Sequence, residues 1–284
     1  MSRLRKICIV CCLLLLGACS STTFFYNRLD FILPWYLDDY AELNRDQEKY
    51  LDELLSPFLA WHRSQELPLY LEVLDQVDGS LDQSMTAEDV AAISAAFEAA
   101  WFRLEERAIN WLLELGDTLS DEQMDGFLEE LWKQQRKYED KYLERSDKKF
   151  REDSYDSLLD SMQDFLGRLD KKQRQMLRVT SEELIRSDHV WLSERAVWLE
   201  KLGLILQREP GWQDRIRDAI AQRDENSSPE YVSTYQHNLR VIHGSVADVL
   251  NSRSDKQDRR LRAKLENLRE DLETLIAQGQ TTAG

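Results

Sequence analysis

The chain has 284 residues, 42% of them hydrophobic, which suits a folded protein with one sizeable core or two small ones rather than a disordered chain. Ten glycines and five prolines are few for this length, and such scarcity is typical of long helices, so the composition predicts an all-α fold. A formal net charge of −16 argues against nucleic acid as a partner.

Residues 1–18 have the pattern of a secretory signal, because a basic start precedes an apolar stretch, residues 7–16, that is short for a membrane-spanning helix. The end of this segment, Leu16-Gly17-Ala18-Cys19, resembles a bacterial lipobox. The resemblance implies cleavage before Cys19, covalent lipid on the Cys19 sulfur and, with Ser20 next, an outer-membrane location facing the periplasm. The alternative is that residues 7–16 form an uncleaved anchor.

The cysteine positions agree with a lipid anchor. Cys8, Cys11 and Cys12 lie inside the signal segment, so the mature chain would keep only Cys19. With that sulfur lipidated, no thiol remains for disulfides, structural zinc or a cysteine nucleophile. We therefore expect no metal and no cofactor besides the covalent lipid on Cys19, and we expect contact with the membrane through that lipid.

The mature chain is predicted to begin with a lipidated N-terminus and an aromatic leading segment, residues 19–43, followed by helices. Apolar residues recur at helical spacing through the first half and predict helices over about 44–59, 68–77, 86–115 and from 120 onward. Pro57 is expected to kink or end the first of these helices, and Gly116 is expected to cap the third. Residues 133–153 are polar on nearly every face, which predicts either a solvent-projecting helix or a connection.

The second half predicts helices over about 155–166, 170–202, 212–223, 231–250 and 254–276. No alternating pattern of a β-strand stands out. We therefore predict an elongated multi-helix bundle of eight to ten helices forming a single all-helical domain, residues 44–277. A seam is considered near residues 167–170, and residues 278–284 are predicted to be a disordered tail.

Four of the predicted helices begin with the same device, a capping residue followed three positions later by glutamine. The pairs are Asn44 and Gln47, Ser120 and Gln123, Asp170 and Gln173, and Ser254 and Gln257. This spacing is that of a capping box, in which the cap side chain accepts from a first-turn N–H and the glutamine accepts from the N–H of the cap. Thr86 with Asp89 is a fifth, weaker copy. Local chemistry does not explain why glutamine occurs four times, because glutamate would serve as well.

The recurring pattern resembles the L-T-x-x-Q motif of Spy/CpxP-type periplasmic helical proteins, which are much shorter. A resemblance over the whole mature chain is carried by FFYNRLDFILPWYLDDY, residues 24–40, by the lipobox before it and by Q-x-x-R-L-x-x-K-L-x-x-L-R-x-D-L from Gln257. These stretches resemble an uncharacterised family of proteobacterial outer-membrane lipoproteins. That resemblance implies a location and no mechanism.

The aromatic leading segment is the best functional candidate in the sequence, because it would place a large contact area close to the lipid. The candidate binding surface consists of Phe24, Phe25, Tyr26, Trp35, Tyr36 and Tyr40. The alternative is that these aromatics fill the core.

No catalytic constellation is recognisable in the sequence. None of the four histidines has glutamate three residues before it, and H-E-x-x-H, G-x-S-x-G and phosphate-binding glycine loops are missing. We therefore expect a non-enzymatic protein.

The function expected from these features is that of a lipid-anchored periplasmic binding protein, chaperone-like or an adaptor in envelope assembly or stress, with a protein client or partner. Its binding site would be an aromatic groove rimmed with carboxylates, which would favour basic clients. One alternative is a structural spacer without a client, whose reach the charged segment 133–153 would set. A less favoured one is a hydrolase that uses aspartate or glutamate.

Overall fold

The computed structural model of the chain describes residues 21–282 and confirms the all-α class, since this part of the chain contains helices, turns and no strand. The helices are α2 (Ser21–Tyr26), α3 (Leu29–Ala41), α4 (Arg45–Trp61), η1 (His62–Glu66), α5 (Leu67–Ser80), α6 (Ala87–Thr118), α7 (Asp121–Tyr142), α8 (Asp147–Leu166), α9 (Lys171–Glu183), α10 (Asp188–Ile205), α11 (Trp212–Ala221), α12 (Pro229–Asn251) and α13 (Asp255–Thr282).

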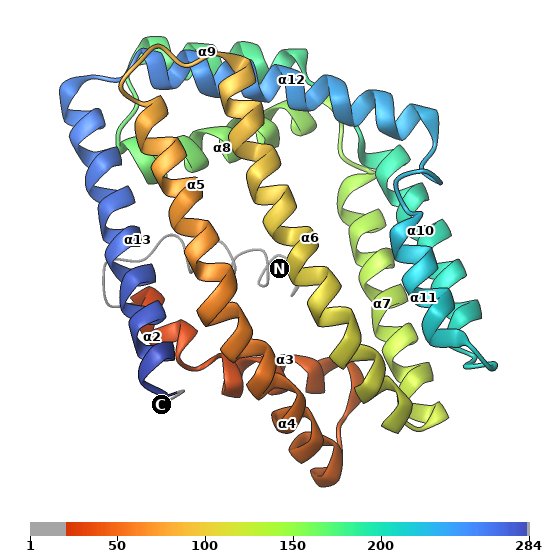
Figure 1. Cartoon of the computed structure of the whole chain (residues 1–284). Helices are drawn as coiled ribbons and strands as arrows, with labels where there is room; N and C mark the ends of the chain where they lie inside the picture. The colour runs from red at the N-terminus through yellow and green to blue at the C-terminus, as the bar shows by residue number, and fades with distance from the viewer. Residues whose placement is uncertain (1–20, 283–284) are drawn as a thin grey trace.

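The helices are arranged like the sides of a frame (Figure 1). Helices α8, α9 and α12 lie along one side, α13 along the next, α3 and α4 along the third, and α7, α10 and α11 along the fourth. Helix α5 packs beside α13, and α6 packs against α12 at one end and against α4 at the other. Both helices therefore cross from one side of the frame to the opposite side.

Three hydrophobic clusters hold this arrangement together. The largest joins α5, α8, α9, α12 and α13 around fully buried side chains such as Leu177 and Leu275. A second joins the end of α6 to α7, α10 and α11 around Trp212. The third joins α3, α4 and the end of α6 around Leu51 and Leu55. Burying leucines at helical spacing supplies most of the stability of such helices, since the helices are marginal by themselves.

Neither Pro57 nor Gly116 ends its helix, and the alternative expectation of a kink at Pro57 stays a prediction. Pro57 lies inside α4, which continues to Trp61 and passes through the π-helical turn η1 into α5. Gly116 does not cap α6 but lies buried within it, where a Cβ atom would come within 3.0 Å of the ring of Trp212. Close packing against Trp212, rather than a helix end, therefore favours glycine at this position.

Segment 133–153 neither projects into solvent nor forms one helix. Helix α7 ends at Tyr142, and the Ser146 side chain caps α8. Several side chains of this polar-looking segment are buried, among them Gln135, whose Nε2 donates to the carbonyl of Leu192 at 3.0 Å. Buried amides with partners of this kind are compatible with a core, so the polar composition was misleading.

The long helix expected from Asp170 is divided into α9 and α10. In the connection between these two helices, the side chain of Asn238 takes up the backbone hydrogen bonds of Ile185. It accepts from the N–H of Ile185 and donates to the C=O of Ile185, both at 2.8 Å. Helix α13 runs to Thr282 and so includes residues 278–282 of the range expected to be a tail. Residues 167–170, the range considered as a seam, connect α8 to α9, and Leu169 among them is buried in the largest cluster.

The four predicted capping pairs are all formed, and they meet two by two. The Asn44–Gln47 box lies beside the Ser120–Gln123 box: Gln47 Nε2 donates to Gln123 Oε1 at 2.9 Å, and Gln123 Nε2 donates to Gln47 Oε1 at 2.8 Å. The second amide hydrogens reach across to the neighbouring turn, from Gln47 to the carbonyl of Thr118 and from Gln123 to the carbonyl of Glu42. We call this arrangement the first joint.

The second joint repeats the first in detail. Gln173 and Gln257 exchange amide hydrogen bonds of 3.0 and 2.9 Å. Gln173 also donates to the carbonyl of Ser252, and Gln257 donates to the carbonyl of Arg168, each carbonyl being two residues before the opposite cap. Each glutamine thus accepts from its own cap and donates twice to the other box. A carboxylate cannot donate, so these contacts account for glutamine in all four boxes.

Two four-helix units surround the two joints. In the first unit α3 packs on α4, α4 on α6 and α3 on α7; in the second unit α8 packs on α9, α9 on α12 and α8 on α13. Aligned on the caps Asn44 and Asp170, the pattern of buried and exposed positions in residues 30–56 closely matches that in residues 156–182. The chain therefore contains an internal structural repeat, and each unit serves as a reference for the other.

Candidate functional site

An open groove lies between α3 and α4. It extends past η1 to the end of α13 and has a volume of about 1770 Å³. Apolar side chains line both walls, namely Phe31, Pro34 and Trp35 on α3 and Leu55, Leu59 and Trp61 on α4. Four carboxylates also line it, Asp30 and Asp38 on α3 and Glu48 and Asp52 on α4. We refer to this feature as the α3–α4 groove.

Contacts on the inner side of α3 fix this wall of the groove. The hydroxyls of Tyr36 and Tyr40 lie 2.8 Å apart, and Gln134 Nε2 of α7 donates to the Tyr40 hydroxyl at 2.8 Å. Asp38 accepts from the N–H of Leu43, and the first joint holds the turn after the helix. With its inner face committed in this way, α3 presents its opposite face to solvent.

The six aromatics predicted to form one binding surface are divided by the structure. Phe24, Phe25 and Trp35 are exposed, whereas Tyr36 is half-buried. Tyr26 and Tyr40 are buried, and both hydroxyls have partners inside the protein, although Tyr26 still lines the groove at its η1 end. The predicted lipidation site, Cys19, lies outside the described residues.

Phe31 belongs to the same aromatic leading segment and is among the most exposed aromatics of the described chain. Its side chain is 72% exposed, and Trp35, one helical turn later, is 62% exposed. Residues four apart lie on the same helix face, so the two rings form a continuous apolar stripe beside the groove. The spacing of Phe31 and Trp35 in the sequence shows that they share a helix face, but core-facing residues have the same spacing, so the sequence does not tell whether that face is exposed.

The second unit shows that this aromatic stripe is not needed for the fold. Counting back from the caps, Phe31 corresponds to Ser157 and Trp35 to Ser161, and both serines are exposed on α8. The inward positions remain apolar in both units, as with Tyr40 and Leu166, which are buried. Serine is thus sufficient where the repeat needs only a solvent-facing position.

A half-buried histidine, His62, holds Tyr26 at the η1 end of the groove. His62 Nδ1 lies 2.7 Å from the Tyr26 hydroxyl, and its Nε2 lies 3.4 Å from the hydroxyl of Tyr70. Burial, together with the nearby Arg63 guanidinium, lowers the pKa of His62 to about 4, so the ring is neutral near pH 7. Thr23, which donates to Asp271 at 2.9 Å, fastens α2 to α13.

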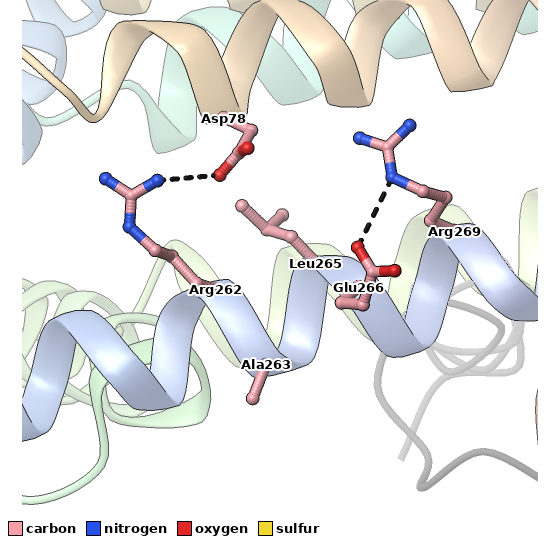
Figure 2. A pocket seen from close by; sticks show the side chains of 6 residues that line it. All are labelled: Asp78, Arg262, Ala263, Leu265, Glu266 and Arg269. Carbon is pink, nitrogen blue, oxygen red and sulfur yellow. Dashed lines mark hydrogen bonds and ion pairs between the residues drawn. The ribbon is translucent and has the colours of Figure 1, made fainter.

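A smaller cavity of about 310 Å³ lies between α5 and α13, and its charged groups are paired (Figure 2). Arg262 contacts Asp78 at 3.0 Å, and Arg269 contacts Glu266 at 3.5 Å. Residues 21–282 contain no cluster of three or more histidine, cysteine, aspartate or glutamate side chains that could hold a metal ion. No helix in the same range is long and apolar enough to span a membrane.

These features define an all-helical protein with an internal repeat and an open, aromatic and acidic groove between α3 and α4. The chain belongs to a family of unknown function, DUF6279, whose model matches residues 39–232. The matched range includes the α4 wall of the groove, whereas α2 and most of α3 precede it. No curated protein and no solved structure matches the chain.

Proposed function

We propose that this protein is a lipid-anchored binding protein of the outer membrane, facing the periplasm, that holds segments of other proteins in the α3–α4 groove. The lipobox resemblance at Leu16 to Cys19 supports the anchor. Because α2 begins at Ser21, two residues after Cys19, the lipid would keep the groove close to the membrane surface. The role would be chaperone-like or that of an adaptor in envelope assembly or stress.

The observation that carries this proposal is the exposure of Phe31 and Trp35 at positions where the second unit has serine. An exposed apolar stripe costs solubility and contributes nothing to the core, and aromatic rings supply much of the energy of protein contacts. Proximity to an open groove adds concave apolar area on α4. Client binding therefore explains the exposure of these two side chains, which folding does not explain.

The test uses the mature chain from Ser20, which contains every residue that the structure describes. Its ability to suppress aggregation of a chemically reduced model client is compared with that of the double variant Phe31→Ser and Trp35→Ser. Those serines are the residues of the second unit, so the fold should tolerate them. A matched control, Val197→Ser with Leu204→Ser, removes two apolar side chains of α10 that are 61% and 68% exposed.

We expect the groove variant to bind the client about tenfold more weakly, which corresponds to about 1.4 kcal/mol, and the control to behave like the parent. Urea unfolding of all three proteins should give similar midpoints. Equal suppression by the parent and the groove variant, or no suppression by the parent, would refute the proposed function.

A further inference from the structure

The two units differ in charge as well as in aromatic content. Glu48 and Asp52 of α4 line the α3–α4 groove. Counting from the caps, the corresponding residues of α9 are Arg174 and Arg178. The carboxylates of the neighbouring helix are retained, because Asp38 of α3 corresponds to Asp164 of α8. The second unit therefore has arginines on α9 at the positions where the first unit has carboxylates on α4, while the carboxylate on α3 keeps its counterpart on α8.

The negative charge of the groove is not neutralised within the described chain. None of Asp30, Asp38, Glu48 and Asp52 forms a salt bridge with a described residue. The basic residue in the lining is Arg63, which stands at the η1 end, donates to Asn27 at 3.0 Å and lies over the ring of Tyr26. Like charges on facing walls repel each other, and a cationic occupant would remove that repulsion.

We propose that the α3–α4 groove takes a protein segment that combines apolar side chains with lysine or arginine. This inference rests on the proposed function and specifies its client class. Trp35 and Phe31 would contact the apolar residues, while Glu48, Asp52 and Asp38 would face the basic ones. The same carboxylates would repel an anionic lipid surface, so a protein segment is favoured over a membrane as the occupant.

The experiment measures binding of three labelled peptides that share one apolar sequence and differ only in carrying lysine, glutamine or glutamate at alternate positions. Affinities are measured by fluorescence anisotropy at low and at physiological salt. The proteins are the parent chain from Ser20 and the variant Glu48→Arg with Asp52→Arg, which installs the charges of the second unit. The control variant, Glu200→Arg with Glu225→Arg, makes the same change in net charge at exposed positions outside the groove.

The lysine peptide should bind the parent about five- to tenfold more tightly than the glutamine peptide at low salt, and the glutamate peptide should bind most weakly. Added salt should reduce this preference. The Glu48→Arg with Asp52→Arg variant should lose it, and the control variant should keep it.

Equal binding of the lysine and glutamine peptides to the parent would overturn the charge proposal and leave the proposed function standing. Failure of all three peptides to bind would overturn both. A parallel titration with vesicles of zwitterionic and of anionic lipid tests a membrane surface as the alternative occupant of the groove. Stronger binding to vesicles than to the lysine peptide, lost on replacing Phe31 and Trp35, would assign the stripe to the membrane surface and overturn the charge proposal.

Discussion

Replacing Gln173 by glutamate is the sharpest test of the paired joints. In an isolated capping box glutamate serves as well as glutamine, because only its oxygen is used. In the second joint Gln173 also donates, to Gln257 Oε1 at 3.0 Å and to the carbonyl of Ser252 at 3.4 Å. The variant Gln173→Glu removes both donors and places a carboxylate opposite two acceptors, in a site with no solvent exposure.

The cost follows from these contacts. Two lost hydrogen bonds are worth about 1 kcal/mol each, and burying a carboxylate beside unpaired acceptors adds about 1–3 kcal/mol. We therefore expect the free energy of unfolding to fall by about 3–5 kcal/mol at pH 7. At low pH the protonated side chain regains one O–H donor, so the loss should become smaller as the pH falls. Helix α6 offers a natural contrast, since Asp89 occupies the glutamine position of an exposed box with no partner box.

Urea unfolding followed by circular dichroism at pH 7 and pH 5 measures this effect. Gln173→Met serves as a control of similar volume that loses the hydrogen bonds without adding a charge. If Gln173→Glu were within about 0.5 kcal/mol of the parent at pH 7, the pairing of the boxes would not be the reason for glutamine, and the reasoning would be refuted.

Three further predictions concern the packing around the groove and the joints. Because burial favours the neutral ring, the stability that His62 contributes is complete above its ordinary pKa of 6.5 and is lost as the pH falls toward about 4. The variant His62→Phe has no ring to protonate, so urea unfolding at a series of pH values should show about 2–3 kcal/mol less acid destabilisation in it than in the parent. Gly116→Ala should lower the thermal midpoint, because a Cβ there would lie 3.0 Å from an indole carbon of Trp212 and should cost about 1–2 kcal/mol of folding free energy. Gly126→Ala should raise the midpoint, because nothing lies within 4 Å of its Cβ position and alanine favours the helix. Arg103→Met should lower the free energy of chemical unfolding by about 3 kcal/mol, because it leaves the buried Glu66 carboxylate unpaired. Adding Glu66→Leu should recover most of that loss, and no recovery would contradict the view that the unpaired carboxylate causes it.

The sequence by itself determined the fold class and the places where most helices begin. Scarce glycine and proline, leucines at helical spacing and five capping boxes are local features, and each acts within one or two turns of its own helix. Thus Asn44 and Ser120 could be recognised as caps without knowledge of the fold. The same locality explains the error at Gly116, where Trp212, distant in the sequence, packs against the glycine.

Only the tertiary structure decided why the boxes contain glutamine and which aromatics face solvent. Gln47 meets Gln123 across 76 residues and Gln173 meets Gln257 across 84, so no local pattern could indicate the pairing. Trp35 and Tyr40 belong to one helix and look alike in the sequence, yet one faces the groove and the other faces α7. The physical reason is that exposure depends on what packs against each face of a helix, and that partner is chosen by the whole chain.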